Sequence, residues 1–262
     1  MKDKILIVKA GGSLIDCEAK WQHFLKEFAA IKKPKILVHG GGKSASALSK
    51  KMGLTPRIIH GRRVTTLEDL PLVIMTFAGL INKKTVAALQ SYGCNALGLT
   101  GADANCIRSS KRPTTPIDYG YVGDIVSIDT SVLLQWLNLG ITPVFCALTH
   151  DGHGQILNTN ADTIAAQLAI ALHDLFETEL LYCLEKPGVL LDSEDSDSLI
   201  KTLDYYQYEK LKHNHQIHSG MIPKLTNCFI ALQNDVKKVT IGDTSLLRED
   251  CPTGTRIILN KD

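Results

Sequence analysis

Short runs of apolar residues alternate along the whole chain with longer segments in which apolar residues recur at helical spacing. The apolar runs lie at residues 4–8, 35–39, 95–100, 141–146, 180–184 and 236–241. Each run has the length of a buried strand, and amphipathic stretches such as residues 19–30 separate them. This alternation is typical of βαβ crossovers and predicts a mostly parallel sheet of about seven or eight strands.

Two further segments carry structural signals of their own. Residues 66–92 form a long helix candidate, and Pro71 fits the first turn of a helix better than its interior. Residues 118–125, DYGYVGDI, place aromatic and β-branched residues between glycines, which favours a hairpin over a crossover helix. We therefore expect a small antiparallel element beside the main sheet.

Composition narrows the class of protein. The chain has 262 residues, of which 44% are hydrophobic and 21% are charged. It can bury a substantial core in one large domain or two coupled lobes, which excludes disordered, collagen-like and small disulfide-linked proteins. Lys and Arg number 29 against 27 Asp and Glu, a formal charge of +2. This balance argues against a protein that coats nucleic acid or an anionic membrane, so phosphate chemistry would need local cations.

The cysteines and the apolar segments bear on location. Seven cysteines are scattered through the chain and none forms a Cys-x-x-Cys pair, which is typical of a reduced intracellular protein. The first apolar run ends at Lys9 and is too short for a signal peptide. No run reaches the roughly 18 apolar residues of a membrane span. We therefore expect a soluble cytoplasmic protein.

Glycine clusters follow the first two predicted strands. Gly11 and Gly12 end the first strand, and Gly40, Gly41 and Gly42 end the second. Glycine lets backbone amides approach an anion closely, and a helix that starts just beyond adds the positive end of its dipole. Strand-to-helix turns also need glycine for structural reasons alone. The spacing is not that of a P-loop, and no G-x-G-x-x-G follows a strand, so a phosphate site here would have another architecture.

Two lysines and a polar segment complete the candidate chemistry. Lys9 ends the first strand at the sheet edge where open α/β folds bind ligands, and Lys224 is expected near the start of a helix after Pro223. Either lysine alone could equally be a solvated surface residue. Asn160 suits the N-cap and Asp162 the first turn of another helix, which by itself could explain both residues. None of the nine histidines has a cysteine or carboxylate at a convincing ligand spacing, so we expect no resident metal site.

Five motifs together resemble the amino-acid kinase family, and within it most closely the N-acetylglutamate kinases. They are KAGGSL at residues 9–14, HGGG at 39–42, GRRVT at 61–65, NTNAD at 158–162 and GMIPK at 220–224. Each motif is weak alone. Their occurrence in order from the first strand to the last, without large insertions, makes the resemblance specific and extends it over essentially the whole chain.

The resemblance implies an α/β fold, an open αβα sandwich with a mainly parallel sheet of about eight strands in a single domain, residues 1–262. An N-terminal lobe, about residues 1–175, would hold the acylated amino acid, and a C-terminal lobe, about residues 176–262, would hold ATP with Mg²⁺. The implied reaction converts the γ-carboxylate of N-acyl-L-glutamate into an acyl phosphate, the second step of arginine biosynthesis. Because the chain starts almost directly at its first strand, we expect an arginine-insensitive homodimer.

The resemblance also implies roles for residues of this chain. Lys9 and Lys224 would stabilise charge on the transferring phosphoryl group, while Asp162 would keep both lysines charged and aimed. A carboxylate is already a nucleophile, so no general base is needed. The other implied contacts are phosphoryl and substrate oxygens on the amides of Gly11, Gly12, Gly41 and Gly42, and substrate binding by Arg63, Asn158 and Asn160.

The chain departs from the family pattern in two places. Lys43 and Arg62 add two cations near the expected acyl-glutamate pocket, where the family usually has uncharged residues. An acyl group with its own carboxylate, as in N-succinyl-L-glutamate, would match them; otherwise both side chains point to solvent. In CLEKPG at residues 183–188, Glu185 stands where the family usually has aspartate, and Gly188 keeps the glycine expected at the nucleotide.

Rival functions stay open at this level. One is a kinase of another acylated or carrier-linked amino acid, such as aminoadipate. Another is a non-catalytic small-molecule sensor on the same fold, although a sensor would have no reason to keep Lys9, Asp162 and Lys224 together. A protein that binds RNA is disfavoured by the balanced charge and by the 6% content of aromatic residues.

Overall fold

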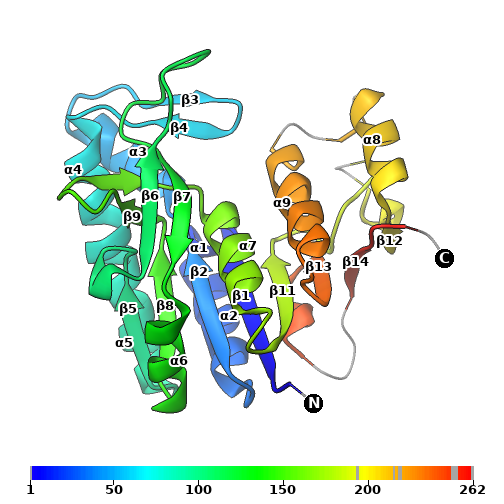
Figure 1. Ribbon diagram of the computed structural model, residues 1–262. Helices are drawn as coiled ribbons and strands as arrows, with labels where there is room; N and C mark the ends of the chain where they lie inside the picture. Colours follow the sequence, from blue (N-terminus) through cyan, green and yellow to red (C-terminus); the bar gives the residue numbers. More distant parts are fainter. Residues whose placement is uncertain (1, 193–194, 215, 218–219, 249–252, 261–262) are drawn as a thin grey trace.

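The main sheet has eight strands and runs through the middle of the molecule (Figure 1). The computed structural model describes residues 2–192, 195–214, 216–217, 220–248 and 253–260. In spatial order the strands are β12 (Thr202–Leu203), β14 (Gly254–Ile257), β13 (Lys238–Gly242), β11 (Glu177–Cys183), β1 (Lys4–Ala10), β2 (Lys35–His39), β8 (Thr142–Cys146) and β5 (Ala96–Leu99). Every neighbouring pair is parallel except β13 and β14. The predicted sheet is confirmed.

The central strands are apolar along their whole length because helices cover both faces of the sheet. In β1 every residue after Lys4 is buried, and in β2 all five residues are buried. Parallel strands of this kind contain near-continuous apolar runs instead of alternating apolar and polar residues. This is why the runs at residues 4–8 and 35–39 are visible in the sequence.

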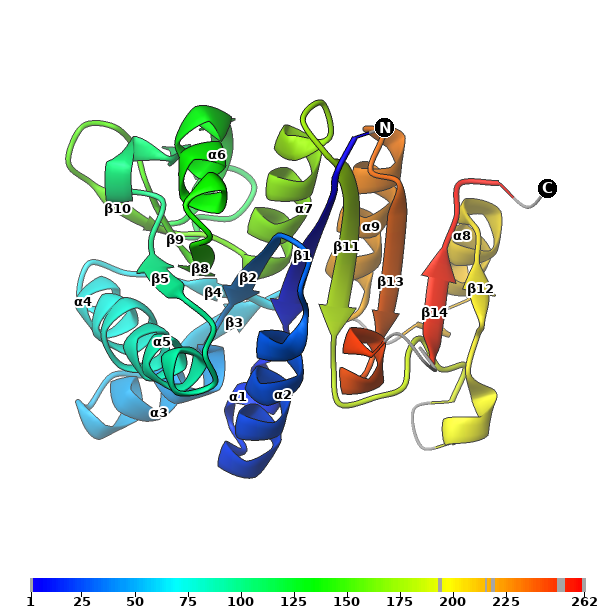
Figure 2. The ribbon, with the colours of Figure 1, turned by 90° about the horizontal axis from the view of Figure 1, so that it is seen from below.

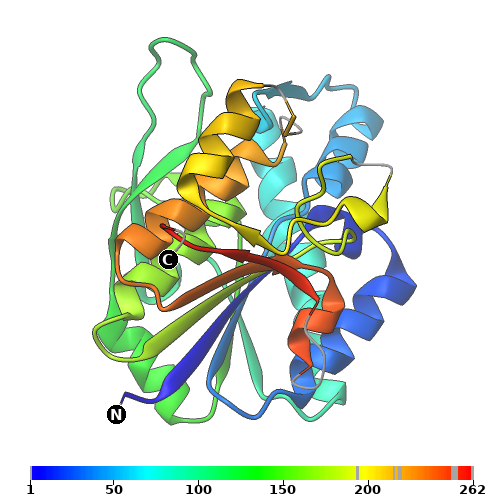
Figure 3. The same ribbon diagram turned by 90° about the vertical axis from the view of Figure 1, so that its right-hand side faces the viewer.

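Two layers of helices enclose the sheet (Figures 2 and 3). One layer consists of α6 (Thr130–Asn138), α7 (Ala161–Leu172), α8 (Tyr205–His213) and α9 (Ile222–Gln233). The other contains α1 (Gly12–Ile15), α2 (Glu18–Ala30), α3 (Gly42–Lys51) and the long helix that ends in α5 (Asn82–Ser91). Separate apolar cores form on the two sides, with Ile164 and Phe229 in one and Phe24 and Leu89 in the other. The αβα sandwich is therefore confirmed.

The helix predicted at residues 66–92 is continuous from Asp69 to Ser91. It consists of α4 (Asp69–Ile74), the π-helical η1 (Met75–Ile81) and α5, and Pro71 lies in its first turn as expected. By length and composition this helix could cross a membrane, so the expectation that no segment could do so is wrong. In this structure Val73 and Phe77 pack in the core.

Smaller sheets lie at the carboxyl edge of the main sheet. One has the order β10 (Ile156–Asn158), β9 (Leu148–His150), β6 (Ile107–Lys111) and β7 (Gly123–Ile128), and a hairpin joins β3 (Arg57–Ile59) to β4 (Arg62–Val64). The hairpin predicted within residues 118–125 is wrong in its first strand. β7 pairs with β6 across a long loop instead, and Gly120, which lies in that loop, forms a bridge to Thr65. Short 3₁₀ turns lie at Asp103–Asn105 (η2), Ser196–Ser198 (η3) and Thr244–Leu247 (η4).

Candidate active site

Two lysines and one aspartate meet at the carboxyl edge of the main sheet. Lys9 comes from the end of β1, Asp162 from the first turn of α7 and Lys224 from the first turn of α9. Lys9 Nζ lies 2.8 Å from Asp162 Oδ1, and Lys224 Nζ lies 2.8 Å from both carboxylate oxygens. All three residues are buried, with exposed fractions of 7 to 8%. The structure thus brings together three residues that are far apart in sequence.

Burial and mutual attraction set the protonation states of this cluster. Burial, with a contribution from the nearby Lys224, lowers the pKa of Lys9 to about 8 although Asp162 opposes the shift. Burial by itself would raise the pKa of Asp162, but the two ammonium groups outweigh it and hold this pKa well below its usual range. At neutral pH the cluster therefore contains two cations and one anion.

The local sequence explains how these side chains reach one point. The Asn160 side chain accepts hydrogen bonds from the amides of Asp162 and Thr163 at 2.8 and 3.1 Å, so it caps α7 as expected. Pro223 stands in the first turn of α9, where its missing N–H costs nothing, and Lys224 follows it in the same turn. Capping and charge organisation are therefore separate roles of neighbouring residues, Asn160 and Asp162.

Tyr182 contacts two members of the cluster, Asp162 and Lys224. Its hydroxyl donates to the backbone carbonyl of Asp162 at 2.9 Å, and Lys224 Nζ lies 5.2 Å from the centre of its ring. Burial raises the pKa of this phenol well above its ordinary value, so it stays protonated. Sequence reasoning missed Tyr182 because an aromatic residue in an apolar strand has the pattern of an ordinary core residue.

The glycine turns differ in what they offer a ligand. The Gly11 amide already donates to the Cys183 carbonyl at 2.8 Å, and its binding of a phosphoryl oxygen stays a prediction. The amides of Gly12 and Gly42 begin α1 and α3 and bond to no other described residue. Gly41 has φ +155°, and a Cβ there would lie 2.3 Å from Ile81 Cδ1. Only glycine fits at this position.

A cleft of about 660 Å³ opens beside the cluster. Residues that were singled out from the sequence make up much of its lining: Gly12, Gly41, Gly42, Lys43, Arg62, Arg63, Asn158 and Asn160. Lys50 is the fourth cation of this lining, and no described lining residue is an Asp or Glu. A cleft lined by cations and free amides favours an anionic ligand.

Arg63 is the most deeply placed of these cations. Its Nη2 donates to the Gly42 carbonyl at 3.0 Å and to Ser46 Oγ, and its Nη1 lies 4.0 Å from Asp69 Oδ1. Its Nε and Nη1 are buried and hydrogen-bond to no described residue. Beside it, Asn158 Nδ2 donates to Thr65 Oγ1 at 2.9 Å. These two nitrogens lie on different edges of the guanidinium, and donors without partners favour an anionic ligand such as a carboxylate nearby.

Residues 4–243 match a family model described as the amino acid kinase family. The chain belongs to the amino acid kinase family. Its relatives include proteins named acetylglutamate kinase from Cytophaga hutchinsonii, 49% identical, and from Bacteroides thetaiotaomicron, 46% identical. Each comparison covers 98% of this chain and 99% of the relative. A protein of the same name from Methanopyrus kandleri is 35% identical, over 93% of this chain and 96% of the relative.

Solved structures agree on the fold. The structure of smu.665 from Streptococcus mutans matches with a TM-score of 0.78 at 26% identity, over 99% of this chain and 100% of that one. N-acetylglutamate synthase from Neisseria gonorrhoeae matches with a TM-score of 0.80 at 24% identity, over all of this chain and 61% of that one. Carbamate kinase from Giardia lamblia, 15% identical, has a TM-score of 0.69 over 99% of both chains. The last two likenesses concern the fold alone.

The two added cations of this amino acid kinase have different surroundings. Lys43 Nζ lies 3.5 Å from Asp16 Oδ2, and its side chain is 75% exposed. Arg62 is half-buried and pairs with no described carboxylate, and burial together with the nearby Arg112 lowers its pKa. Arg112 is itself bound by Asp124 through two hydrogen bonds of 3.0 and 3.1 Å from Nε. Of the two, Arg62 is the cation left open to a ligand in the cleft.

The residues assigned to nucleotide lie apart from the lysine and aspartate cluster. Glu185 accepts a hydrogen bond from Lys20 Nζ at 2.7 Å, which lowers its pKa. A Cβ at Gly188 would lie 2.6 Å from both Leu199 Cδ1 and Thr255 Oγ1, so this glycine is needed for packing. Among the described residues, no hydrogen bond or ion pair joins either residue to the cluster, and their roles toward nucleotide stay predictions.

Proposed function

We propose that this chain transfers the γ-phosphoryl group of ATP to the γ-carboxylate of an N-acyl-L-glutamate, with N-acetyl-L-glutamate as the first candidate, in the second step of arginine biosynthesis. The names of the relatives support this substrate, and they do not favour an aminoadipate kinase or a sensor. The observation that carries the proposal is the buried cluster of Lys9, Asp162 and Lys224 beside a cationic cleft. A catalytic machinery of this kind has no use in a sensor.

The chemical problem is to bring two anions together. A γ-carboxylate oxygen attacks the γ-phosphorus of ATP, a new O–P bond forms, and the bond from that phosphorus to the β,γ-bridging oxygen breaks to release ADP. No proton moves, so no general base is required. Lys9 and Lys224 would face the charge that spreads over the transferring group. One unit charge at 4 Å is worth roughly 4 kcal/mol at an effective dielectric constant near 20.

Asp162 has a positioning role in this scheme. Both its oxygens are occupied by ammonium groups, so it offers no open position to a metal ion. Mg²⁺ would therefore arrive with ATP and be held mainly by its phosphates, where it neutralises charge. The amides of Gly12, Gly41 and Gly42 would hold substrate and phosphoryl oxygens, and Asn160 would act through its cap of α7.

The α-carboxylate of the substrate would bind between Arg63 and Asn158. That placement leaves Arg62 beside the acyl group. An acetyl group would leave this cation without a counter-charge, whereas an acyl group that ends in a carboxylate, as in N-succinyl-L-glutamate, would supply one. Lys43 is a weaker candidate for this contact because Asp16 already pairs with it.

The two substrates would bind in different lobes of the chain. The acylated amino acid would occupy an N-terminal lobe, about residues 1–175, and the nucleotide a C-terminal lobe, about residues 176–262, of one domain in the cytoplasm.

A homodimer would form where β5 ends the main sheet. Met75, Leu80 and Leu97 expose 52, 53 and 36% of their surface there, and β5 has no second neighbour in the described sheet. Such an edge invites a partner strand.

The test is ATP-dependent formation of an acyl phosphate, trapped as a hydroxamate, with N-acetyl- and N-succinyl-L-glutamate side by side. We expect turnover of one or both substrates and its loss in Lys224→Ala. Lys210→Ala, which removes an exposed lysine of α8, serves as the matched control and should keep the activity. No turnover with either substrate would refute the proposal, and equal turnover of both would refute the role given to Arg62.

A further inference from the structure

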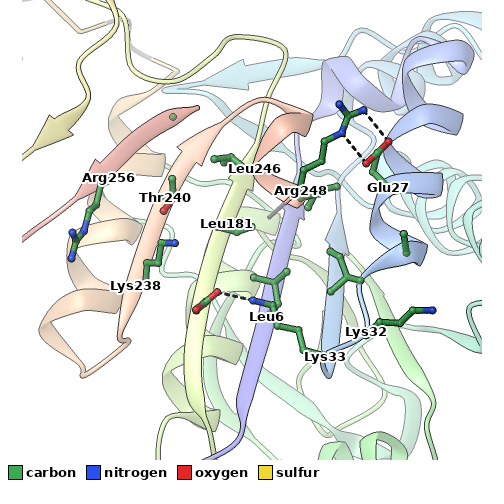
Figure 4. A pocket seen from close by; sticks show the side chains of 15 residues that line it. Leu6, Glu27, Lys32, Lys33, Leu181, Lys238, Thr240, Leu246, Arg248 and Arg256 are labelled. Atoms are coloured by element: carbon green, nitrogen blue, oxygen red, sulfur yellow. Dashed lines mark hydrogen bonds and ion pairs between the residues drawn. The ribbon is translucent and has the colours of Figure 1, made fainter. Parts of the chain in front are cut away.

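A second pocket lies on the face of the sheet that α7 and α9 do not cover. It has a volume of about 620 Å³ and extends over β1, β11, β13 and β14 between α2 and η4 (Figure 4). It shares no lining residue with the cleft. Neither Glu185 nor Gly188, the two residues assigned to nucleotide, lines it, so the pocket is separate from the residues that the proposed function uses.

The floor of this pocket is apolar apart from one hydroxyl. Leu6 and Leu181 from the strands and Leu246 from η4 contribute the apolar surface. Thr240 lies beside them with an exposed fraction of 7%, and its Oγ1 hydrogen-bonds to no described residue. A buried hydroxyl without a partner loses its hydrogen bonds to water, so a ligand atom that accepts from it would recover that loss.

The strand register brings cations to this hydroxyl. Lys238 and Thr240 are two residues apart on β13, so their side chains share one face of the sheet. Arg256 stands directly opposite Thr240 in the antiparallel pair of β13 and β14. Lys32 lies just beyond the end of α2 on the other side of the pocket. The cations thus surround the apolar floor on two sides.

The charges of the pocket do not balance. Its lining contains Lys32, Lys33, Lys238, Arg248 and Arg256, against two carboxylates. Both carboxylates are already paired: Glu27 accepts from Arg248 at 3.0 Å twice, and Glu179 accepts from Lys33 at 3.0 Å. Lys32, Lys238 and Arg256 pair with no carboxylate among the described residues. Three cations are therefore left to a ligand.

We propose that this pocket binds a small organic polyanion, with two or more carboxylate or phosphate groups on an apolar body. The three unpaired cations and the Thr240 hydroxyl would bind its anionic groups, and the leucine floor would contact its apolar body. The same charges disfavour a ligand with a net positive charge. The occupant would touch both the end of α2 and the β13–β14 pair, which lie on opposite sides of β1.

A fluorescent pyrene trisulfonate, which has three anionic groups on an apolar ring, is the probe. Titration of the full chain, followed by fluorescence anisotropy, should show saturable binding of the probe. The double variant Lys238→Glu and Arg256→Glu should weaken binding about tenfold or more. Thr240→Val should weaken it about threefold to tenfold while preserving the shape of the side chain.

The matched control is the double variant Lys201→Glu and Lys237→Glu. It changes the net charge equally, but neither residue lines the pocket. It should bind the probe like the parent chain, and both double variants should keep the acyl-phosphate activity if that activity exists. Equal weakening in both double variants, absence of saturable binding, or full displacement by inorganic sulfate at equal concentration would each overturn the proposal. None of these results depends on the proposed function.

Discussion

At the scale of single residues, the candidate active site is defined by a surplus of one positive charge. Two buried ammonium groups share the carboxylate of Asp162, and Tyr182 fixes the carbonyl of the same residue. The carboxylate keeps both lysines in place but neutralises only one of them. The remaining charge is available to an anion that enters the site, and its availability depends on the protonation of Lys9.

The pKa of Lys9 makes that availability depend on pH. Burial lowers this pKa to about 8, so the ammonium group is present below pH 8 and is lost as the pH rises above it. We expect kcat/KM for the phosphoryl transfer to fall about tenfold per pH unit above 8, because it reports the free enzyme. The basic limb of kcat should lie at higher pH, since bound phosphates stabilise the ammonium form. Steady-state rates from pH 6 to 10 test both limbs, and coincident limbs would contradict this account.

Asp162 should matter for stability as well as for catalysis. Asp162→Asn leaves two buried ammonium groups without a counter-charge, and we expect the free energy of unfolding to fall by about 3 to 5 kcal/mol. Urea denaturation measures the change.

The control for this prediction is the triple variant Lys9→Met, Asp162→Asn and Lys224→Met, which removes all three charges together. It should recover most of the lost stability but none of the activity, because no unpaired charge stays buried. A triple variant less stable than Asp162→Asn would show that the charges are not the cause.

At the scale of elements, the turns after β1 and β2 hold the glycines close to neighbouring elements. The turn after β2 packs Gly41 against the π-helical part of the long helix, next to Ile81 and Phe77. The helix therefore determines how α3 begins, and with it the position of the Gly42 amide in the cleft.

Gly41→Ala should disturb this contact. Its Cβ would lie 2.3 Å from Ile81 Cδ1 and 3.0 Å from Phe77 Cδ1, at a φ of +155°. We expect a loss of about 2 kcal/mol or more in the free energy of unfolding and a higher KM for the acyl-glutamate. Gly79→Ala is the control: it lies in the same π-helical stretch with nothing within 4 Å of the added Cβ, so its effect on stability should stay within about 1 kcal/mol. Equal effects of both variants in urea denaturation would contradict the packing argument.

The elements also show where sequence patterns are informative. The buried parallel strands were predictable because covering both faces leaves continuous apolar runs, and the cap by Asn160 was predictable because it depends on adjacent residues. The small antiparallel sheet was only partly predictable, since the partner of β7 is β6, across a long loop whose path depends on the bridge between Gly120 and Thr65. Such a contact joins residues far apart in the chain, so local sequence patterns do not reveal it.

At the scale of the whole molecule, the site depends on long-range placement. The roles of Lys9, Asp162 and Lys224 came from a resemblance, and the fold then brings the three residues within 2.8 Å contacts. Tyr182 and the use of the Gly11 amide by Cys183 could not be predicted in this way. The contact between Gly11 and Cys183 joins residues about 170 positions apart, and the contact between Tyr182 and Asp162 joins residues about 20 positions apart. Both depend on packing that only the assembled sheet provides.

The free edge of β5 leads to a prediction about assembly. If the proposed homodimer forms there, Met75→Glu with Leu80→Glu should convert it to a monomer, since charges replace the exposed apolar surface. Size-exclusion chromatography with light scattering gives the mass directly. Leu139→Glu, at a residue that is 72% exposed on another part of the surface, should leave the dimer intact. A double variant that remains dimeric, or a parent chain that is monomeric, would refute this interface.

The central position of β1 has a consequence for synthesis. This strand is made before β11, and Lys4 pairs with Glu177 in β11, so one edge of β1 has no partner until roughly 170 more residues have been added. At about 5 to 20 residues per second, the delay is about 9 to 35 s. During that time an apolar strand is open to wrong pairing, which makes the nascent chain a client for chaperones. Lys9, in the same strand, can thus be enclosed in its cluster only after Asp162 and Lys224 have been added.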